Sequence, residues 1–255
     1  MSYLWRAARL KLGLAPSPLL ATFAGVTFAV DTEHYQLRSR LKQQAVQPVL
    51  ARLLGLCDSK TLFVDIGANV GIFSLLVASR AGAHALAIEP VRSTFHALVR
   101  NCSLNSALAI TPLNLAMGTA PALVEITAVP KSGVNRIAIM TSRQGEPRQK
   151  TFQLEMDQLQ LHELARSFRR VVIKIDVERY EFEVLAGAQQ LLGLDMPIAV
   201  CVEAEPEQHG RVHALLGSRF HACNPKALAR QNILVSDEND LNDVFFVNDA
   251  WGRVA

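Results

Sequence analysis

The sequence predicts an α/β protein in which helices pack on both faces of a doubly wound, mainly parallel sheet. The chain has 255 residues, 50% of them hydrophobic and 19% charged, which fits one large folded domain. Short apolar runs rich in Val, Ile and Leu recur along the chain, and helix-like segments separate most of them. Buried strands that alternate with helices form parallel sheets, whose ligand sites lie at the carboxyl ends of the strands.

Five apolar runs are expected to be the buried strands of this sheet. They cover residues 61–67, 84–90, 109–118, 170–177 and 196–205. Residues 119–158 show strand patterns without helices, and DVFFVN (243–248) is a further strand, so we expect the sheet to end with antiparallel members. The segment EVLAGAQQLL (183–192) predicts one amphipathic packing helix.

Residues 1–56 are expected to form a small helix and hairpin appendage to a main domain of residues 57–255. The opening YLWRAARLKLGL (3–14) predicts an amphipathic helix, for which packing onto the body is favoured over membrane contact. The alternation in residues 21–34 predicts a hairpin. Apolar residues at helical spacing before residue 57 predict a bent helix or two short ones, because Pro48 interrupts them.

Composition argues against several classes of function. The formal net charge is +3 and the basic residues are scattered, so a nucleic-acid partner is not expected. The uncharged stretch 12–30 contains Pro and Gly, which argues against a membrane span. We expect a cytoplasmic protein without a disulfide or zinc framework, because no signal peptide or CxxC spacing accompanies its four cysteines. They are Cys57, Cys102, Cys201 and Cys223.

The turn GANVG (67–71), between a predicted strand and an apolar helix, has the pattern of a nucleotide-binding turn. Gly67 and Gly71 would let the backbone approach a ligand, so a side chain at Gly67 is expected to intrude on that ligand. Asn69 tolerates a left-handed conformation, and the helix start offers free N–H groups to a carboxylate. The turn lacks the P-loop Lys and the G-x-G-x-x-G of dinucleotide enzymes. A purely structural turn is the alternative.

Two acids near this turn favour S-adenosylmethionine as the ligand. Glu89 ends the next predicted strand, where an acid can accept hydrogen bonds from two ribose hydroxyl groups. Asp65 directly precedes the turn, and a carboxylate there suits a positively charged sulfonium but would repel a pyrophosphate. An NAD-dependent oxidoreductase is the alternative enzyme, and an acid that caps a helix next to Pro90 is the alternative role for Glu89.

A second cluster of charged residues is predicted at the same edge of the sheet. In the strand VVIKIDV (171–177), Lys174 and Asp176 alternate onto one side, and Asp176 falls where the strand ends. Glu178 follows, and Glu203 ends the neighbouring strand. Three converging carboxylates would supply a general base or hold a divalent cation, so these four residues are the candidate catalytic group. The alternative is a structural ion pair of Lys174 with one of the acids, with Glu203 capping a loop.

The segments that carry these residues resemble, in order, the FkbM family of S-adenosylmethionine-dependent methyltransferases. They are DIGANVGIFSLLVA (65–78), AIEP (87–90), NCSLN (101–105), LNLAMG (113–118) and IKIDVERYEFEVLAGAQQLL (173–192). The resemblance implies a Rossmann-like, class I methyltransferase fold and O-methylation of a hydroxyl group on a sugar or another small metabolite. It implies that the cofactor contacts Asp65, Gly67, Ala68, Asn69, Gly71, Glu89, Pro90 and Ala116.

The chain departs from this family at one position. Where the family usually has D-V-E-G-x-E, Arg179 replaces the glycine. The guanidinium could recognise an anionic or hydroxyl-rich acceptor, or it could form an ion pair with Glu178 or Glu181 that holds a helix start. For the protein as a whole, the replacement of this glycine leaves a further alternative, namely a protein that keeps the cofactor-binding fold but has lost catalysis. The expected partner is a small-molecule or glycan acceptor, and the sequence leaves the acceptor, the metal dependence and the oligomeric state open.

Overall fold

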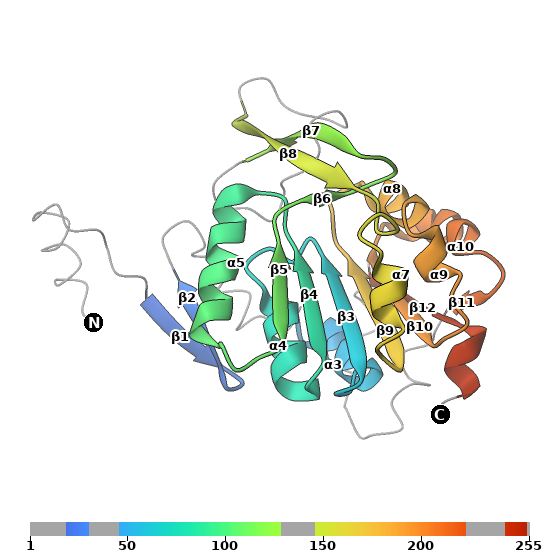
Figure 1. The fold of residues 1–255 in the computed structure, drawn as a ribbon, viewed down its shortest axis with the longest axis horizontal. Coiled ribbons are helices and arrows are strands. Elements are labelled where there is room, and N and C mark those ends of the chain that lie inside the picture. Colours follow the sequence, from blue (N-terminus) through green and yellow to red (C-terminus); the bar gives the residue numbers. More distant parts are fainter. Residues whose placement is uncertain (1–18, 31–45, 129–145, 223–242, 254–255) are drawn as a thin grey trace, which may run out of the picture.

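The computed structural model describes residues 19–30, 46–128, 146–222 and 243–253, and it confirms the predicted α/β class. A seven-stranded sheet forms the centre, with helices on either side (Figure 1). Its strands, in spatial order, are β11 (Phe220–Ala222), β12 (Asp243–Asn248), β10 (Ile198–Glu203), β9 (Arg170–Ile175), β3 (Thr61–Ile66), β4 (His84–Ile88) and β5 (Ile110–Leu113). The predictions for residues 3–14 and 31–45 lie outside the described residues.

The sheet is mainly parallel, as predicted. The pairs β10–β9, β9–β3, β3–β4 and β4–β5 are all parallel. Strand β12 is antiparallel to both β10 and β11, so it runs against the other six strands. The chain leaves β3 for β4 and β5 on one side and later returns to β9 and β10 on the other. The carboxyl ends of β3 and β9 therefore flank the switch point at which doubly wound sheets bind ligands.

Two apolar clusters cover the two faces of the sheet, because successive strand side chains point to opposite faces. Leu62 and Val64 of β3 pack with one set of helices, and Phe63 packs with the other. The first set is α7 (Leu161–Ala165), α8 (Glu181–Ala186), α9 (Gln189–Leu192) and α10 (His209–Leu216). The second is α3 (Val46–Leu56), α4 (Ile72–Ala81) and α5 (Arg92–Leu104). Short 3₁₀ turns occupy Pro206–Gln208 and Asp249–Arg253. None of the described helices is long and apolar enough to cross a membrane.

The predicted hairpin is confirmed by the antiparallel pair β1 (Leu19–Phe23) and β2 (Val26–Val30). Two amide side chains hold it, one from α5 and one from the residue that directly follows α5. Asn101 Oδ1 accepts a hydrogen bond from the Ala29 N–H at 2.8 Å, and Asn105 Oδ1 accepts one from the Thr27 N–H at 3.0 Å. The segment NCSLN thus fastens the hairpin to the main sheet.

The described part of the predicted helix before residue 57 is a single helix, α3. Pro48 lies in its first turn, where backbone N–H groups have no partner within the helix, so the proline ring is tolerated there.

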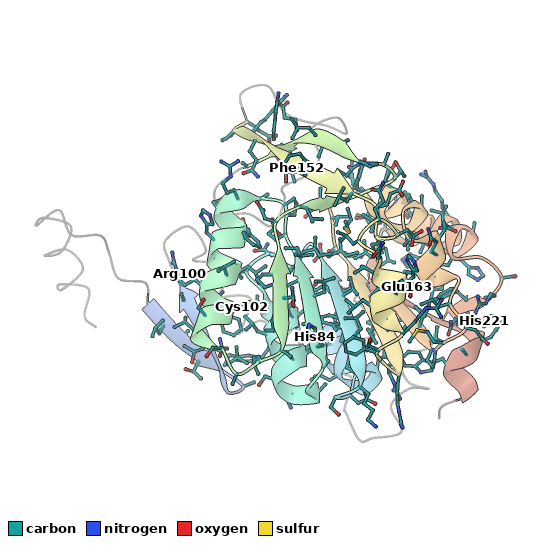
Figure 2. The ribbon with its side chains drawn as sticks, viewed as in Figure 1. His84, Arg100, Cys102, Phe152, Glu163 and His221 are labelled. Carbon is teal, nitrogen blue, oxygen red and sulfur yellow. The ribbon has the colours of Figure 1, made fainter. Side chains whose placement is uncertain are left out.

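The apolar run 109–118 forms two strands instead of the predicted one. After β5 the chain leaves the main sheet at Asn114, whose Nδ2 donates to the backbone oxygens of Glu89 and Pro90 at 2.8 and 3.2 Å. It then forms β6 (Ala116–Met117) in a second sheet, ordered β6, β8 (Arg148–Leu154), β7 (Ala122–Thr127). Figure 1 shows this small sheet across the edge of the main sheet, and Figure 2 shows Phe152 on it.

The predicted helix 183–192 is divided into α8 and α9. A Cβ at Gly187 would lie 2.0 Å from the Gly118 backbone oxygen, so the two main chains pack directly against each other here. The Asp157 carboxylate then accepts hydrogen bonds from the N–H groups of Gln190 and Leu191 at the start of α9. A periodic pattern cannot reveal such a break, because its cause lies far away in the sequence.

Candidate active site

The predicted site residues lie at the carboxyl-end edge of the parallel strands. The turn 67–71 follows β3, and Glu89 follows β4. Asp176 comes directly after β9, and Glu203 is the last residue of β10. Since β3, β4, β9 and β10 are neighbours and parallel, the topology brings these groups to one edge.

Asp65 connects β3 to the start of α4. Its Oδ2 accepts hydrogen bonds from the backbone N–H and the hydroxyl group of Ser74, at 3.1 and 2.6 Å. Its Oδ1 is buried without a hydrogen-bond partner. Burial raises the pKa of Asp65, although the Lys174 charge and the Ser74 hydroxyl group oppose this. Sequence analysis missed Ser74, for which the only signal is a hydroxyl group inside an apolar helix.

The two glycines of the turn lie in close contact with other parts of the protein. Gly67 and Gly71 both have positive φ, 82° and 88°. A Cβ at Gly67 would lie 1.8 Å from the Asp176 backbone oxygen, and one at Gly71 would lie 2.6 Å from a Leu98 methyl group. We therefore correct the expectation that side chains here would meet the ligand. They would meet the end of β9 and helix α5, because these elements pack directly on the turn. Asn69, with φ of 53°, has the left-handed conformation that the sequence predicted.

Glu89 is buried and held by the main chain. Its Oε2 accepts a hydrogen bond from the Asn69 N–H at 3.0 Å, and its Oε1 accepts one from the Val91 N–H at 2.8 Å. Burial raises the pKa of Glu89 to about 7, even though both hydrogen bonds favour the charged form. Each carboxylate oxygen has another lone pair. Glu89 is thus an oriented acceptor of further hydrogen bonds at the tip of β4.

The small sheet holds the loop after Glu89 in place. Gln149 of β8 donates from Nε2 to the Pro90 backbone oxygen at 2.9 Å and accepts at Oε1 from the Arg92 N–H at 3.2 Å. Ala116 is buried in β6, where it packs with Val124. Sequence analysis missed Gln149, because no local pattern relates a residue on β8 to the end of β4.

Lys174 is a buried cation between two acids. Its Nζ lies 2.8 Å from Asp176 Oδ2 and 4.7 Å from the centre of the Phe73 ring. In the strand register Lys174 is paired with Asp65 of β3. Burial alone would lower the pKa of Lys174, but the charges of Asp176 and Asp65 outweigh burial and raise it. The ammonium group is therefore a fixed positive charge beneath the edge of the sheet.

Asp176 and Glu203 form an interacting pair of carboxyl groups. The negative charge of Asp176, more than burial, raises the pKa of Glu203 to about 8. Glu203 is exposed and stands opposite Asp243 of β12 in the register. The predicted convergence of carboxylates is therefore present for this pair.

The segment after Asp176 has an unusual backbone. Glu178 and Arg179 have positive φ values of 54° and 75°, a conformation that suits glycine better than other residues. The Arg179 N–H donates to Oε1 of the buried Glu181 at 3.0 Å, at the start of α8. This carboxylate thus holds the main chain of Arg179, whose side chain is exposed.

The residues fit S-adenosylmethionine by their chemistry. An oriented carboxylate at Glu89 suits a ribose diol, and residues 65–71 contain an acid but no basic residue, which suits a sulfonium better than a pyrophosphate. Within the described part of the chain, no group of three His, Cys, Asp or Glu side chains could hold a metal ion. Next to Asp176, the Lys174 ammonium supplies the positive charge that a bound cation would supply.

Comparison with protein families identifies the chain. The family model of the methyltransferase FkbM domain matches residues 65–226, more than half of the 255 residues. The chain belongs to the FkbM methyltransferase family. The matched region begins at Asp65 and includes Glu89, Asp176 and Glu203. As an FkbM protein it is an S-adenosylmethionine-dependent methyltransferase, and this membership favours the methyltransferase interpretation over an NAD-dependent oxidoreductase.

This FkbM protein is similar in sequence to a hexuronic acid methyltransferase and in structure to TYW2. The hexuronic acid methyltransferase AglP of Haloferax volcanii is 25% identical over 186 residues, which cover 72% of this chain and 73% of AglP. M. jannaschii TYW2 in complex with AdoMet is 13% identical, with a TM-score of 0.44 over 91% of this chain and 84% of TYW2. P. horikoshii TYW2 in complex with MeSAdo is 14% identical, with a TM-score of 0.46 over 95% of this chain and 79% of that TYW2 chain.

Proposed function

We propose that this protein transfers the methyl group of S-adenosylmethionine to a hydroxyl group of a sugar-like acceptor. The observation that carries the proposal is the interacting pair Asp176 and Glu203, at the same edge of the sheet as Glu89 and the turn. An alcohol oxygen must lose its proton when it attacks a methyl group, and a carboxylate with a raised pKa is suited to accept that proton. The hexuronic acid named for AglP supports a sugar as the class of acceptor.

The residues at β3 and β4 would bind and orient the cofactor. Glu89 would accept hydrogen bonds from the ribose hydroxyl groups, with its carboxylate held by the N–H groups of Asn69 and Val91. The absence of basic residues in the turn favours a cationic ligand over a pyrophosphate. S-adenosylmethionine, when bound, supplies a methyl group on a positively charged sulfur. The chain contributes by holding the acceptor oxygen in line with that group.

Arg179 would help to select an acidic acceptor. Its side chain is exposed three residues after Asp176, on a backbone with positive φ. A guanidinium group binds a carboxylate through two parallel hydrogen bonds, whereas a neutral sugar offers no such partner. We therefore propose a sugar that carries a carboxylate, with a hydroxyl group as the oxygen that is methylated.

A second candidate is methylation of the sugar carboxylate itself. Arg179 favours it, because a guanidinium group could hold this carboxylate near the cofactor. The Asp176–Glu203 pair favours a hydroxyl group, because a carboxylate is already ionised at neutral pH and needs no base. The two products differ in chemistry, since a methyl ester is cleaved by mild base and a methyl ether is not.

The test uses methyl-labelled S-adenosylmethionine with 4-nitrophenyl β-D-glucuronide and the corresponding glucoside. We expect a product heavier by one methyl group, formed faster from the glucuronide and stable in mild base. Loss of the label in mild base would favour the second candidate. Calorimetric binding of S-adenosylmethionine without transfer to any of a wider panel of glycosides would overturn the proposal and favour a protein that has lost catalysis.

A further inference from the structure

A row of polar side chains crosses three neighbouring strands below the proposed reaction site. Asp65 of β3 is paired in register with Lys174 of β9, which is paired with Cys201 of β10. Asp176 and Glu203 come two residues after Lys174 and Cys201, so they lie on the same face of the sheet. At one end of the row, Asp65 is bonded to Ser74 of α4. The row therefore extends from helix α4 to Glu203, the last residue of β10.

Within this row Asp176 forms an ion pair with Lys174. Lys174 is only 2% exposed, so water does not solvate its ammonium group. The positive charge is therefore stabilised by the neighbouring acids. Asp176 is the acid that contacts it directly, at 2.8 Å, while the Phe73 ring covers the ammonium from α4. Transfer of a proton to Asp176 would remove the charge that this buried cation requires. Asp176 is thus a poor proton acceptor.

Glu203 is placed differently. It is exposed at the end of β10, and the charged groups that face it are Asp176 and Lys174 of β9 and Asp243 of β12. Glu203 and Asp176 directly follow the paired residues Val202 and Ile175, and two carboxyl groups this close share one proton, because both ionise together only at high cost. Because Lys174 holds Asp176 in its charged form, this proton resides on Glu203, consistent with the raised pKa of about 8.

We infer that Glu203, rather than Asp176, takes the proton of the acceptor hydroxyl group, and that Lys174 and Asp176 are positioning residues for it. This inference rests on the proposed function. Glu203 first releases its own proton to water. In the step, the acceptor oxygen forms a bond to the methyl carbon as the carbon–sulfur bond breaks. The electron pair of the carbon–sulfur bond then stays on sulfur, which becomes a neutral thioether, and the hydroxyl proton passes to the ionised Glu203. Exposure then lets Glu203 release the proton to water.

The kinetic test compares Glu203→Gln with Asp176→Asn on the glucuronide, across about pH 6 to about pH 9. We expect Glu203→Gln to lower kcat by about a hundredfold or more and to flatten the pH profile, with cofactor affinity unchanged. Asp176→Asn should keep a pH-dependent kcat but move its midpoint to lower pH, because the charge that opposes ionisation of Glu203 is gone. The control Glu205→Gln removes an exposed acid two residues after Glu203, and it should change neither kcat nor the pH profile. A flat profile for Asp176→Asn with a normal profile for Glu203→Gln would overturn the inference.

A second measurement needs no acceptor. In protein labelled with ¹³C at the glutamate carboxyl carbon, the signal absent from Glu203→Gln identifies Glu203. We expect this signal to titrate with a pKa of about 8 in the natural protein and with a lower pKa in Asp176→Asn, where the first cause of the raised value is gone. Titration at the ordinary value of 4.5 in both proteins would overturn the inference. Absence of methyl transfer by the natural protein would count against the proposed function alone, since the titration still locates the proton.

Discussion

The cofactor half and the acceptor half of the site are built by different kinds of interaction. At the ends of β3 and β4, the Glu89 carboxylate is bonded to the main chain, through the N–H groups of Asn69 and Val91. At the ends of β9 and β10, Asp176 forms an ion pair with the Lys174 side chain, and its charge acts on the neighbouring carboxyl group of Glu203. The first half therefore has a fixed geometry, and the second has a proton whose position can change.

This difference indicates a division of labour. A ligand that is held the same way in every cycle benefits from acceptors that the backbone orients, because backbone groups neither rotate nor titrate. A reacting hydroxyl group needs a partner that can gain and lose a proton near neutral pH. The two halves meet along the paired strands β3 and β9, and at the end of this pair Gly67 packs against the backbone of Asp176.

The largest expected effect comes from filling that point of contact. Gly67→Ala should lower the free energy of unfolding by about 3 kcal/mol or more, because its Cβ would lie 1.8 Å from the Asp176 backbone oxygen. Gly25→Ala is the matched control, since Gly25 has φ of 84°, close to the 82° of Gly67, but nothing within 4 Å of the added Cβ. In Gly25→Ala, backbone strain alone should lower the free energy of unfolding, by about 1 kcal/mol. Urea unfolding measures both, and equal losses would show that the two halves do not depend on this contact.

Removal of the Glu89 carboxylate should affect the cofactor half alone. Glu89→Ala is expected to weaken S-adenosylmethionine binding by about 1.5–3 kcal/mol, or about 12- to 160-fold, the range for hydrogen bonds to a charged group. Titration calorimetry gives the dissociation constant. The control Glu125→Ala removes a half-buried acid paired with Arg148 on the small sheet and should leave binding unchanged. Normal affinity in Glu89→Ala would contradict the assignment of Glu89 to the ribose.

Cofactor affinity should also depend on pH through Glu89. Its pKa is raised from 4.5 to about 7, so the neutral form persists to a much higher pH than for an exposed glutamate. The ionised form is the better acceptor for ribose hydroxyl groups, and affinity should therefore increase as the pH rises through about 7. Below that pH the dissociation constant should change by at most about tenfold per pH unit. Titration calorimetry between about pH 6 and pH 8 measures this dependence. In Glu89→Ala, the part of the pH dependence of cofactor affinity that comes from Glu89 should be absent.

The smallest effect is expected at Arg179, which belongs to the acceptor half. Arg179→Gly should raise the free energy of unfolding by up to about 1 kcal/mol, because glycine adopts a φ of 75° without strain. Cofactor affinity should be unchanged, while KM for the glucuronide increases relative to the glucoside. Ala24→Gly, at another positive φ in the hairpin turn, should relieve strain without an effect on the acceptor. Equal KM ratios in the natural protein and Arg179→Gly would make Arg179 structural.

The sequence predicts the cofactor half better because its interactions are local. A strand, a glycine turn, a helix and an acid at the next strand tip follow one another along the chain, and each has a recognisable pattern. The positions of Gly67, Asn69 and Glu89 follow from this order alone. Even there the expected effect of a side chain at Gly67 was wrong, because the atom it would meet belongs to Asp176, more than a hundred residues away in the sequence.

The acceptor half and the small sheet depend on contacts that no local pattern contains. The pairing of Asp176 with Lys174 was predicted as an alternative, but the coupling to Glu203 arises from the register of β9 and β10. The break at Gly187 results from its contact with Gly118, and the attachment of the Pro90 loop results from Gln149. These features appear only when distant segments are placed side by side.

The most direct test of this division of labour is single-turnover methyl transfer to the glucuronide at saturating S-adenosylmethionine. Glu89→Gln and Glu203→Gln are compared with the natural protein, each with its own saturating concentration set by calorimetry. Since saturation compensates for weak binding, Glu89→Gln should transfer the methyl group within about threefold of the natural rate. Glu203→Gln should be slower by about a hundredfold or more. Similar losses in both variants would contradict the account, because cofactor binding and proton removal would then not be separate tasks of the two halves.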